Sequence, residues 1–219
     1  MTKIKEIFTS IQGEGPFVGY KLAFIRFCNC NLDCKYCDTD FLADSETRDY
    51  TPQELADLVN KENVHSVSLT GGEPLLFVDF LKEFLPLCKH KIYLETNATL
   101  PDKLKQIIDY VDIVAADIKL ETSTGKSMPY HLHDEFFEIA AKKHLFIKVV
   151  FSSNITDDEI RKSCDLAKRY NVELILQPVM NNRGFAVDIK TIEKIFDKFT
   201  KIYPNSRLIP QMHKFLNVR

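Results

Sequence analysis

Three cysteines on one short stretch are the residues of this sequence best suited to chemistry. Cys30, Cys34 and Cys37 form a C-x3-C-x2-C run directly after the apolar segment 22–27. Thiolates are the natural ligands of iron–sulfur clusters. Three thiolates on one loop can hold three irons of a cubane 4Fe-4S cluster, and the fourth iron then has no protein ligand. The run therefore predicts a cluster whose open iron binds and reduces a small molecule.

Other interpretations of these cysteines stay open at this point. A structural zinc site normally takes four ligands in paired C-x2-C or Cys/His groups. Cys28 is the one nearby candidate for a fourth ligand, but it lies two residues before Cys30, where a strand would point it elsewhere. The thiols could also be buried and have no chemical role, as is expected of Cys88 and Cys164. Disulfides are not expected, because nothing in the sequence marks secretion.

Length and charge narrow the class of protein. The chain has 219 residues, of which 45% are hydrophobic, and this predicts a single domain covering 1–219 with a full core. The formal net charge is −2, and no basic stripe predicts a nucleic-acid partner. The first residues do not form a signal peptide, and no apolar run is long enough to cross a membrane. We therefore expect a cytoplasmic location, in a reducing environment.

The elements that must position the cysteines alternate between expected strands and helices. The strands are short, continuous apolar runs, which are typical of a parallel sheet covered by helices in a doubly wound sheet or a barrel. Thr51 and Thr156 begin helices with capping boxes that Glu54 and Glu159 complete, and the polar segment 41–50 is expected to be irregular. The expected strands are 4–10, 22–28, 65–70, 91–95, 112–117, 146–151, 172–177 and 207–210. One expected helix begins at 51, another lies within 128–143, and the others cover 76–88, 101–110, 156–170 and 188–203.

Polar residues stand at the ends of most expected strands. The carboxyl ends of parallel strands form the active site in both doubly wound sheets and barrels. Gly71-Gly72-Glu73-Pro74 directly follows the strand that ends at Thr70, and its two glycines expose backbone groups to a ligand. The polar residues at or near the other strand ends are Glu95, Asp117, Lys148, Gln177 and Gln211.

The cysteine run followed by the Gly-Gly-Glu-Pro turn resembles the radical S-adenosylmethionine (SAM) enzymes. That resemblance implies an α/β fold, an open partial (β/α)6 barrel of the radical SAM type, here with a short N-terminal strand extension. It also implies that Cys30, Cys34 and Cys37 hold the 4Fe-4S cluster and that the Gly-Gly-Glu-Pro turn contacts the amino group of SAM. In this superfamily the reduced cluster cleaves SAM, and the resulting 5′-deoxyadenosyl radical takes a hydrogen atom from the substrate. No catalytic side chain is implied beyond this radical.

Further motifs resemble the 7-carboxy-7-deazaguanine synthases over nearly the whole chain. The resemblance implies a lyase that converts 6-carboxy-5,6,7,8-tetrahydropterin to 7-carboxy-7-deazaguanine with loss of ammonia, for queuosine and other deazapurine pathways. It also implies magnesium, an electron donor such as flavodoxin or ferredoxin, and a homodimer. The motifs are Ser10 to Gly15, Phe24 to Phe27, Cys30 to Leu32, Cys37-Asp38-Thr39, Thr70 to Leu75, Glu95-Thr96-Asn97, Gln177-Pro178-Val179 and Gln211 to Lys214.

The resemblance also implies which residues contact the substrate. The backbone and Gln12 can read the amide and amino edge of a pterin, and the Arg26 guanidinium can bind its carboxylate with two hydrogen bonds. The alternative for Arg26 is an ion pair with Glu6 or Glu14, and for Gln12 and Glu14 it is stabilisation of the turn. The implied substrate positions are Ile11, Gln12, Gly13, Arg26 and Thr70, to which we add Glu95 and His213 as candidates.

Magnesium and SAM positions follow from the same resemblance. Thr39 falls where the family has a magnesium ligand, with Asp38 and Asp40 beside it, and the remaining ligands are expected from substrate and water. The chain departs from the family where it has Asp117-Ile118-Lys119 in place of Ser-Pro-Lys, and Ala98 in place of a glycine. The implied SAM positions are Tyr36, Asp38, Gly72, Asp117, Ile118, Lys119, Gln177, Pro178, Val179 and Met180.

Two alternative functions remain open on the sequence. The Asp-x-Lys pattern at 117–119 is familiar from activating enzymes of glycyl-radical proteins, although the Gln12 to Gly15 and Cys37-Asp38-Thr39 elements argue against this activity. A non-catalytic zinc-binding protein is the alternative from a different class. A cluster protein purified without air is brown and a zinc protein is colourless, so the colour separates these two.

Overall fold

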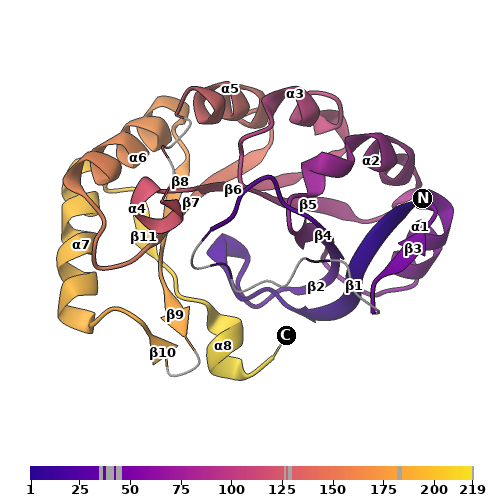
Figure 1. The fold of residues 1–219 in the computed structure, drawn as a ribbon, viewed down its shortest axis with the longest axis horizontal. Helices are drawn as coiled ribbons and strands as arrows, with labels where there is room; N and C mark the ends of the chain where they lie inside the picture. Colours follow the sequence, from indigo (N-terminus) through magenta and orange to yellow (C-terminus); the bar gives the residue numbers. More distant parts are fainter. Residues whose placement is uncertain are drawn as a thin grey trace.

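A curved, mostly parallel sheet with helices on its outer side forms this protein (Figure 1). The computed structural model describes residues 1–34, 37, 42, 46–125, 127, 130–181 and 184–218. The sheet order is β11-β8-β7-β6-β5-β4-β2-β1-β3. The strands are β1 (Thr2–Ile11), β2 (Lys21–Phe27), β3 (Arg48–Tyr50), β4 (Ser66–Gly71), β5 (Lys91–Thr96), β6 (Ile113–Ile118), β7 (His144–Phe151), β8 (Glu173–Pro178) and β11 (Ser206–Leu208).

Neighbouring strands from β2 to β11 are parallel, while β1 is antiparallel to β2 and β3 is antiparallel to β1. Within the described residues the edge strands β3 and β11 do not pair, so the sheet is an open arc. The predicted partial barrel with an N-terminal strand extension is therefore confirmed, the extension being β1. A small hairpin of β9 (Met180–Asn181) and β10 (Gly184–Phe185) lies on the open side of the arc, beside α8 (Figure 1).

The longer helices lie along the convex side of the sheet (Figure 1). None of the described helices has both the length and the apolar character needed to cross a bilayer. The longer helices are α1 (Pro52–Val59), α2 (Val78–Phe84), α5 (Tyr130–Ala140), α6 (Asp157–Tyr170) and α7 (Ile189–Ile202), and the four-residue α3 (Pro101–Leu104) lies on the same side. The short elements are α4 (Glu121–Thr124), α8 (Met212–Leu216), η1 (Gly15–Phe17), η2 (Pro74–Phe77), η3 (Leu85–Leu87) and η4 (Ile108–Tyr110).

Side chains alternate between the two faces of each strand, and the two faces carry different residues. On the convex face, apolar side chains pack against the helices in the main core. On the concave face, Phe24, Tyr93 and Phe146 belong to a smaller apolar cluster. The same face carries Glu95, two residues beyond Tyr93, and Lys148, two residues beyond Phe146. The strands thus bury an apolar floor and present polar side chains above it, toward their carboxyl ends.

The predicted helix starts are confirmed. Thr51 and Thr156 each accept a hydrogen bond from the backbone N–H three residues on, and Glu54 and Glu159 complete both capping boxes. Asp188 caps α7 by accepting from the Thr191 N–H.

Three expected elements differ in the structure. The expected helix 101–110 is interrupted after Leu104, and that over 76–88 is helical as α2 between two 3-10 turns, the second of which contains Pro86. The segment 41–50 was expected to be irregular, but Arg48–Tyr50 is strand β3, paired with residues 2–4. A long-range pairing supplies this strand, so the local sequence carries no sign of it.

Candidate active site

A cavity at the carboxyl ends of the parallel strands is lined by the three cysteines of the run and by most of the polar residues from the strand ends. The cysteine loop, the Gly-Gly-Glu-Pro turn and the concave face of the sheet all contribute to its wall. The lining residues are Glu14, Cys30, Leu32, Cys34, Cys37, Thr70, Gly71, Gly72, Glu95, Thr96, Asn97, Ala115, Asp117, Lys119, Lys148, Val150, Gln177, Val179, Met180, Gln211 and Lys214.

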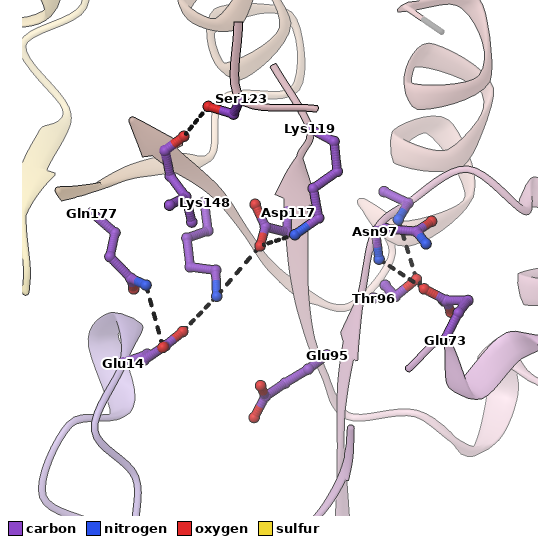
Figure 2. A network of polar contacts seen from close by, with 12 residues as sticks. Glu14, Glu73, Glu95, Thr96, Asn97, Asp117, Lys119, Ser123, Lys148 and Gln177 are labelled. Carbon is purple, nitrogen blue, oxygen red and sulfur yellow. Dashed lines mark hydrogen bonds and ion pairs between the residues drawn. The ribbon is translucent and has the colours of Figure 1, made fainter. Parts of the chain in front are cut away.

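A chain of charged side chains crosses the cavity (Figure 2). Lys148 Nζ lies 2.5 Å from Glu14 Oε2 and 3.5 Å from Asp117 Oδ2, and Lys119 Nζ lies 2.8 Å from the same Asp117 oxygen. Gln177 and Gln211 donate side-chain hydrogen bonds to Glu14 Oε1, at 3.2 Å and 2.8 Å. One loop carboxylate is thus held by β7, β8 and the C-terminal segment.

Mutual attraction keeps the side chains of Glu14 and Lys148 ionised although both are buried. Burial acts to raise the pKa of Glu14, but the Lys148 ammonium outweighs it and lowers this pKa to about 2. Burial acts to lower the pKa of Lys148, and the carboxylates of Glu14 and Asp117 reverse the effect and raise it above the ordinary value for lysine. Both groups therefore carry their charges at neutral pH.

Glu95 is another carboxylate of the cavity, and its hydrogen bonds come from neutral donors. Its Oε1 accepts hydrogen bonds from Gln12 Nε2 at 3.1 Å and Ser68 Oγ at 2.9 Å, and its Oε2 accepts one from Thr70 Oγ1 at 3.2 Å. These bonds fix the carboxylate on the cavity wall, apart from the Glu14–Lys148 pair (Figure 2). Glu95 is therefore placed to accept hydrogen bonds from N–H groups of a bound heterocycle.

A further carboxyl group, that of Glu73, is fully buried and joins the Gly-Gly-Glu-Pro turn to the end of β5 (Figure 2). It accepts hydrogen bonds from Leu75 N–H at 3.0 Å, Thr96 Oγ1 at 2.9 Å and Asn97 N–H at 2.9 Å. Burial raises its pKa to about 7, although the three hydrogen bonds act in the opposite direction. This group links the two loops that stand next to the cysteines.

The cysteine loop and the Gly-Gly-Glu-Pro turn touch backbone to backbone. Glu73 N–H donates to Asn29 O at 2.9 Å, and Gly72 N–H donates to Phe27 O at 3.1 Å. A Cβ on Gly72 would lie 1.7 Å from the Asn29 carbonyl oxygen, so only glycine fits this position. Gly71 has φ +108°, a backbone conformation that also requires glycine. The two glycines therefore serve close packing of the loops as well as exposure of backbone groups.

The three cysteines of the run face the cavity, and the donor set fits an iron–sulfur cluster. Cys30, Cys34 and Cys37 are not joined in disulfides, and burial raises the pKa of the first two. Among the described residues no three His, Cys, Asp or Glu side chains converge on a single metal ion. A cubane cluster does not need such convergence, because each cysteine binds a different iron. Cys28 is fully buried, 3.9 Å from Thr47 Oγ1, and does not line the cavity.

The loop 12–15 packs against the C-terminal segment on the open side of the arc. Met212 N–H donates to Gly13 O at 2.8 Å, and a Cβ on Gly13 would lie 2.4 Å from His213 Nδ1. Together with the bond from Gln211 to Glu14, these contacts tie the two segments together. The cavity wall is thus built from both ends of the described chain.

The structure brings most of the residues at predicted SAM positions to the cavity, but not all of them. Gly72, Asp117, Lys119, Gln177, Val179 and Met180 line it. The Ile118 side chain belongs instead to the main core, and Pro178 is buried without lining the cavity. Tyr36 and Asp38 lie outside the described residues, as does the predicted magnesium ligand Thr39.

The predicted substrate residues fall into two groups. Thr70 and Glu95 line the cavity, and Gln12 reaches it through its bond to Glu95. Arg26 forms an ion pair with Glu6 at 2.7 Å and lies over the Phe8 ring. Ile11 is 37% exposed, and Gly13 and His213 pack against each other.

Two features of the site had no role assigned from sequence. Asn97 is buried, lines the cavity and approaches both Cys30 and Asn31. Ala98 has φ +57°, in the left-handed region that glycine adopts without strain. The glycine that the resemblance implies at position 98 was the available signal for this backbone conformation.

Comparison with known proteins agrees with this geometry. Residues 24–192 match the model of the Radical SAM superfamily, a range that contains the cysteine run, the Gly-Gly-Glu-Pro turn and most of the parallel sheet. The chain is therefore a radical SAM protein. Its cofactors are those of the superfamily, a 4Fe-4S cluster and SAM.

The curated relatives define the family more narrowly. The chain is 35% identical to a 7-carboxy-7-deazaguanine synthase of Geobacter sulfurreducens, over 98% of this chain and 96% of that protein. It is 34% identical to one of Archaeoglobus fulgidus, over 98% and 97% of the two chains. The chain belongs to the 7-carboxy-7-deazaguanine synthase family. The crystal structure of QueE from Escherichia coli shares the fold, with a TM-score of 0.65 at 20% identity over 97% of this chain and 94% of that one.

Proposed function

We propose that this chain converts 6-carboxy-5,6,7,8-tetrahydropterin to 7-carboxy-7-deazaguanine with loss of ammonia. One observation carries the proposal: the cysteines that suit a cluster and the carboxylates that suit a pterin line a single cavity, in a chain of this family. A radical formed at the cluster has to reach the substrate without meeting solvent, and a shared cavity meets that requirement. The curated relatives give no support to the glycyl-radical activase or to the zinc-binding protein.

Cys30, Cys34 and Cys37 would hold the 4Fe-4S cluster, leaving one iron for SAM. When bound, the cluster and SAM supply the hydrogen-atom abstraction that starts the reaction. The peptide groups of Gly71 and Gly72 stand beside the cysteine loop and would bind the amino acid part of SAM. Asp117 and Lys119, held in an ion pair of 2.8 Å, would contact the rest of it together with Gln177, Val179 and Met180. Tyr36, Asp38, Ile118 and Pro178 remain predicted SAM positions.

Glu14 and Glu95 would orient the pterin by accepting hydrogen bonds from its N–H edge. Lys148 keeps Glu14 ionised, and three neutral donors hold Glu95, so neither carboxylate has to move when the ligand arrives. Gln12, Thr70 and the backbone of Ile11 and Gly13 would complete this contact. Arg26 and His213 are proposed to bind the substrate carboxylate, which requires Arg26 to turn away from Glu6.

Magnesium, the reductant and the assembly complete the proposal. Thr39 would supply one magnesium ligand, with substrate and water supplying the others. Magnesium bound there would supply a positive charge that helps to orient the substrate, and Thr39→Ala is expected to weaken the magnesium dependence of turnover. An electron donor such as flavodoxin or ferredoxin would reduce the cluster, and the protein would act as a homodimer.

Turnover without air tests the proposal directly. The purified protein, with its cluster reconstituted, is incubated with 6-carboxytetrahydropterin, SAM and a chemical reductant. We expect 7-carboxy-7-deazaguanine, ammonia and 5′-deoxyadenosine to form together. Cleavage of SAM that never yields the deazapurine, under conditions where a synthase of known activity turns over, would contradict the substrate assignment while leaving the superfamily assignment intact.

A further inference from the structure

Asn97 presents its amide nitrogen to the sulfur of Cys30. Asn97 is 5% exposed, and its Nδ2 lies 3.9 Å from Cys30 Sγ and 2.8 Å from Asn31 Oδ1. The backbone N–H of Leu32 also donates to Cys30 Sγ, at 3.4 Å. The first cysteine of the run therefore faces two N–H donors, one from its own loop and one from the end of β5.

The hydrogen bonds around Asn97 fix which way its amide points. Thr99 N–H donates to Asn97 Oδ1 at 3.1 Å, and a backbone N–H can only donate. The amide oxygen must therefore face Thr99, and the NH2 group must face Asn31 and Cys30. The Thr99 hydroxyl donates to the same oxygen at 2.6 Å and accepts from Asn31 Nδ2 at 2.9 Å, which closes a small network of side chains.

The backbone of Asn97 is held as firmly as its side chain. Its N–H donates to the buried Glu73 at 2.9 Å, and Thr96 Oγ1 donates to the same carboxyl group (Figure 2). The next residue, Ala98, has a left-handed backbone, and its carbonyl oxygen lies 3.1 Å from Nδ1 of the buried His133. A side chain fixed at both ends next to a sulfur is prearranged for that sulfur and loses little freedom when iron binds.

We propose that Asn97 is a positioning residue for the cluster, which orients the Cys30 loop through Asn31 and donates an N–H···S hydrogen bond to the Cys30 thiolate. Such bonds draw electron density from the sulfur and raise the reduction potential of the cluster. Asn97 thereby makes the cluster easier to reduce and easier to retain. The proposal rests on Cys30 being a cluster ligand, as proposed above.

Asn97→Asp is the variant that tests the N–H group, because it keeps the oxygen facing Thr99 and replaces the NH2 group by a second oxygen. Asn60→Asp is the matched control. Asn60 Oδ1 accepts from Lys89 N–H at 2.8 Å and its Nδ2 donates to Leu87 O at 2.9 Å, so the same substitution is made in the same arrangement away from the cysteines. Asn97→Ser, which retains a hydroxyl donor, is the milder variant.

The readouts are the iron content after reconstitution and the midpoint potential of the cluster, followed by electron paramagnetic resonance. We expect Asn97→Asp to take up less iron and to have a lower midpoint potential than wild type, Asn97→Ser to lie between them, and Asn60→Asp to match wild type. A folded Asn97→Asp protein that takes up no iron also supports the proposal. A loaded Asn97→Asp or Asn97→Ser protein with the wild-type potential would overturn it.

Protein that fails to fold does not leave the question open. If Asn97→Asp is unfolded by circular dichroism, Asn97→Ser decides, and unfolding of both variants would show that Asn97 only supports the loop, which also overturns the proposal. Cys30→Ala separates this result from the proposed function. If Cys30→Ala keeps a full cluster, the ligand assignment fails first, whatever the Asn97 variants do.

Discussion

The Glu14 carboxylate lies 2.5 Å from the Lys148 ammonium, although the two residues are 134 positions apart in the chain. The pair is largely buried, with 17% and 13% of the two side chains exposed. An ion pair removed from water is costly to break from one side, because the remaining charge stays buried without its partner. This pair therefore links the stability of the fold to the shape of the cavity.

Lys148→Met is expected to destabilise the protein by about 3 kcal/mol, since Glu14 keeps only its two glutamine donors. Adding Glu14→Gln to Lys148→Met should recover much of the loss, because no charge is then left buried. The free energy of unfolding in urea measures both effects. Lys162→Met is the control: Lys162 pairs with Asp158 on the exposed side of α6, where the loss should stay below about 1 kcal/mol. Equal losses at Lys148 and Lys162 would contradict the prediction.

Glu73 should give the protein a pH-dependent stability. Its folded pKa of about 7 lies above the unfolded value of 4.5, so the unfolded chain loses its proton first as pH rises. Stability is therefore complete below pH 4.5 and declines as pH rises through 7, by about 3 kcal/mol for a shift of this size.

Glu73→Gln replaces the titrating carboxyl group by an amide that does not titrate. Between pH 4.5 and 8 the wild type should therefore lose about 3 kcal/mol of stability relative to the variant. Urea unfolding at several pH values, with Glu62→Gln as a surface control, measures the difference. Parallel pH profiles for wild type and Glu73→Gln would show that this carboxyl group does not titrate in the range.

Ala98→Gly is expected to stabilise the protein slightly. A left-handed backbone costs an alanine about 1–2 kcal/mol, while glycine adds about 0.5–1 kcal/mol of entropy cost on folding. The net gain should be at most about 1.5 kcal/mol, visible as a small rise in melting temperature. Ala140→Gly, at the buried end of α5, should instead lower it. A clear loss of stability in Ala98→Gly would mean that the methyl group packs better than the backbone strain costs.

Cys30, Cys34 and Cys37, rather than Cys28, should be the cluster ligands. Each Cys→Ala variant is reconstituted with iron and sulfide and compared by iron content and visible absorbance. The three cavity cysteines should each be needed, whereas Cys28→Ala should retain the cluster, because that thiol is buried away from the cavity. Loss of the cluster in Cys28→Ala together with its retention in Cys30→Ala would reverse the assignment.

Arg26→Ala should raise the KM for the pterin or abolish turnover, with the cluster and SAM binding intact. Loss of a charge-assisted hydrogen bond corresponds to about 1.5–3 kcal/mol, or roughly ten- to hundredfold in kcat/KM. Arg207→Ala is the control, because Arg207 also pairs with a glutamate, Glu173, but lies on the edge strand β11 and is not a predicted substrate residue. Wild-type kinetics in Arg26→Ala would leave Arg26 with only its Glu6 ion pair.

The local sequence was sufficient to predict features that depend on interactions between residues close together in the chain. The capping boxes at Thr51 and Thr156, and the apolar strands with polar ends, follow from hydrogen bonds and periodicity within a few residues. The partial barrel followed from resemblance, since the alternation by itself also fits a doubly wound sheet. For Arg26, the sequence left open either a contact with the substrate or an ion pair with Glu6 or Glu14. The structure has the ion pair with Glu6.

Contacts between distant residues could not be predicted in this way. Nothing near Glu14 indicates Lys148 as its partner, and the pairing of β3 with β1 depends on the path of the whole chain. The position of Asn97 was equally hidden, because its role depends on Glu73, Thr99 and Cys30 meeting at one point. Motif recognition names the residues of such a site, and only the fold shows which of them touch.

The contact between residues 12–14 and 211–213 has a consequence for synthesis on the ribosome. Gln211 is translated 197 residues after Glu14, to which it donates a hydrogen bond, and Met212 is translated 199 residues after Gly13, whose carbonyl accepts from its N–H. The parallel strands can pair as they emerge, whereas this wall of the cavity forms only after residues 211–213 have been made. A nascent chain therefore lacks this part of the cavity wall until residues 211–213 have been translated, and iron delivered before that point would meet an incomplete cavity.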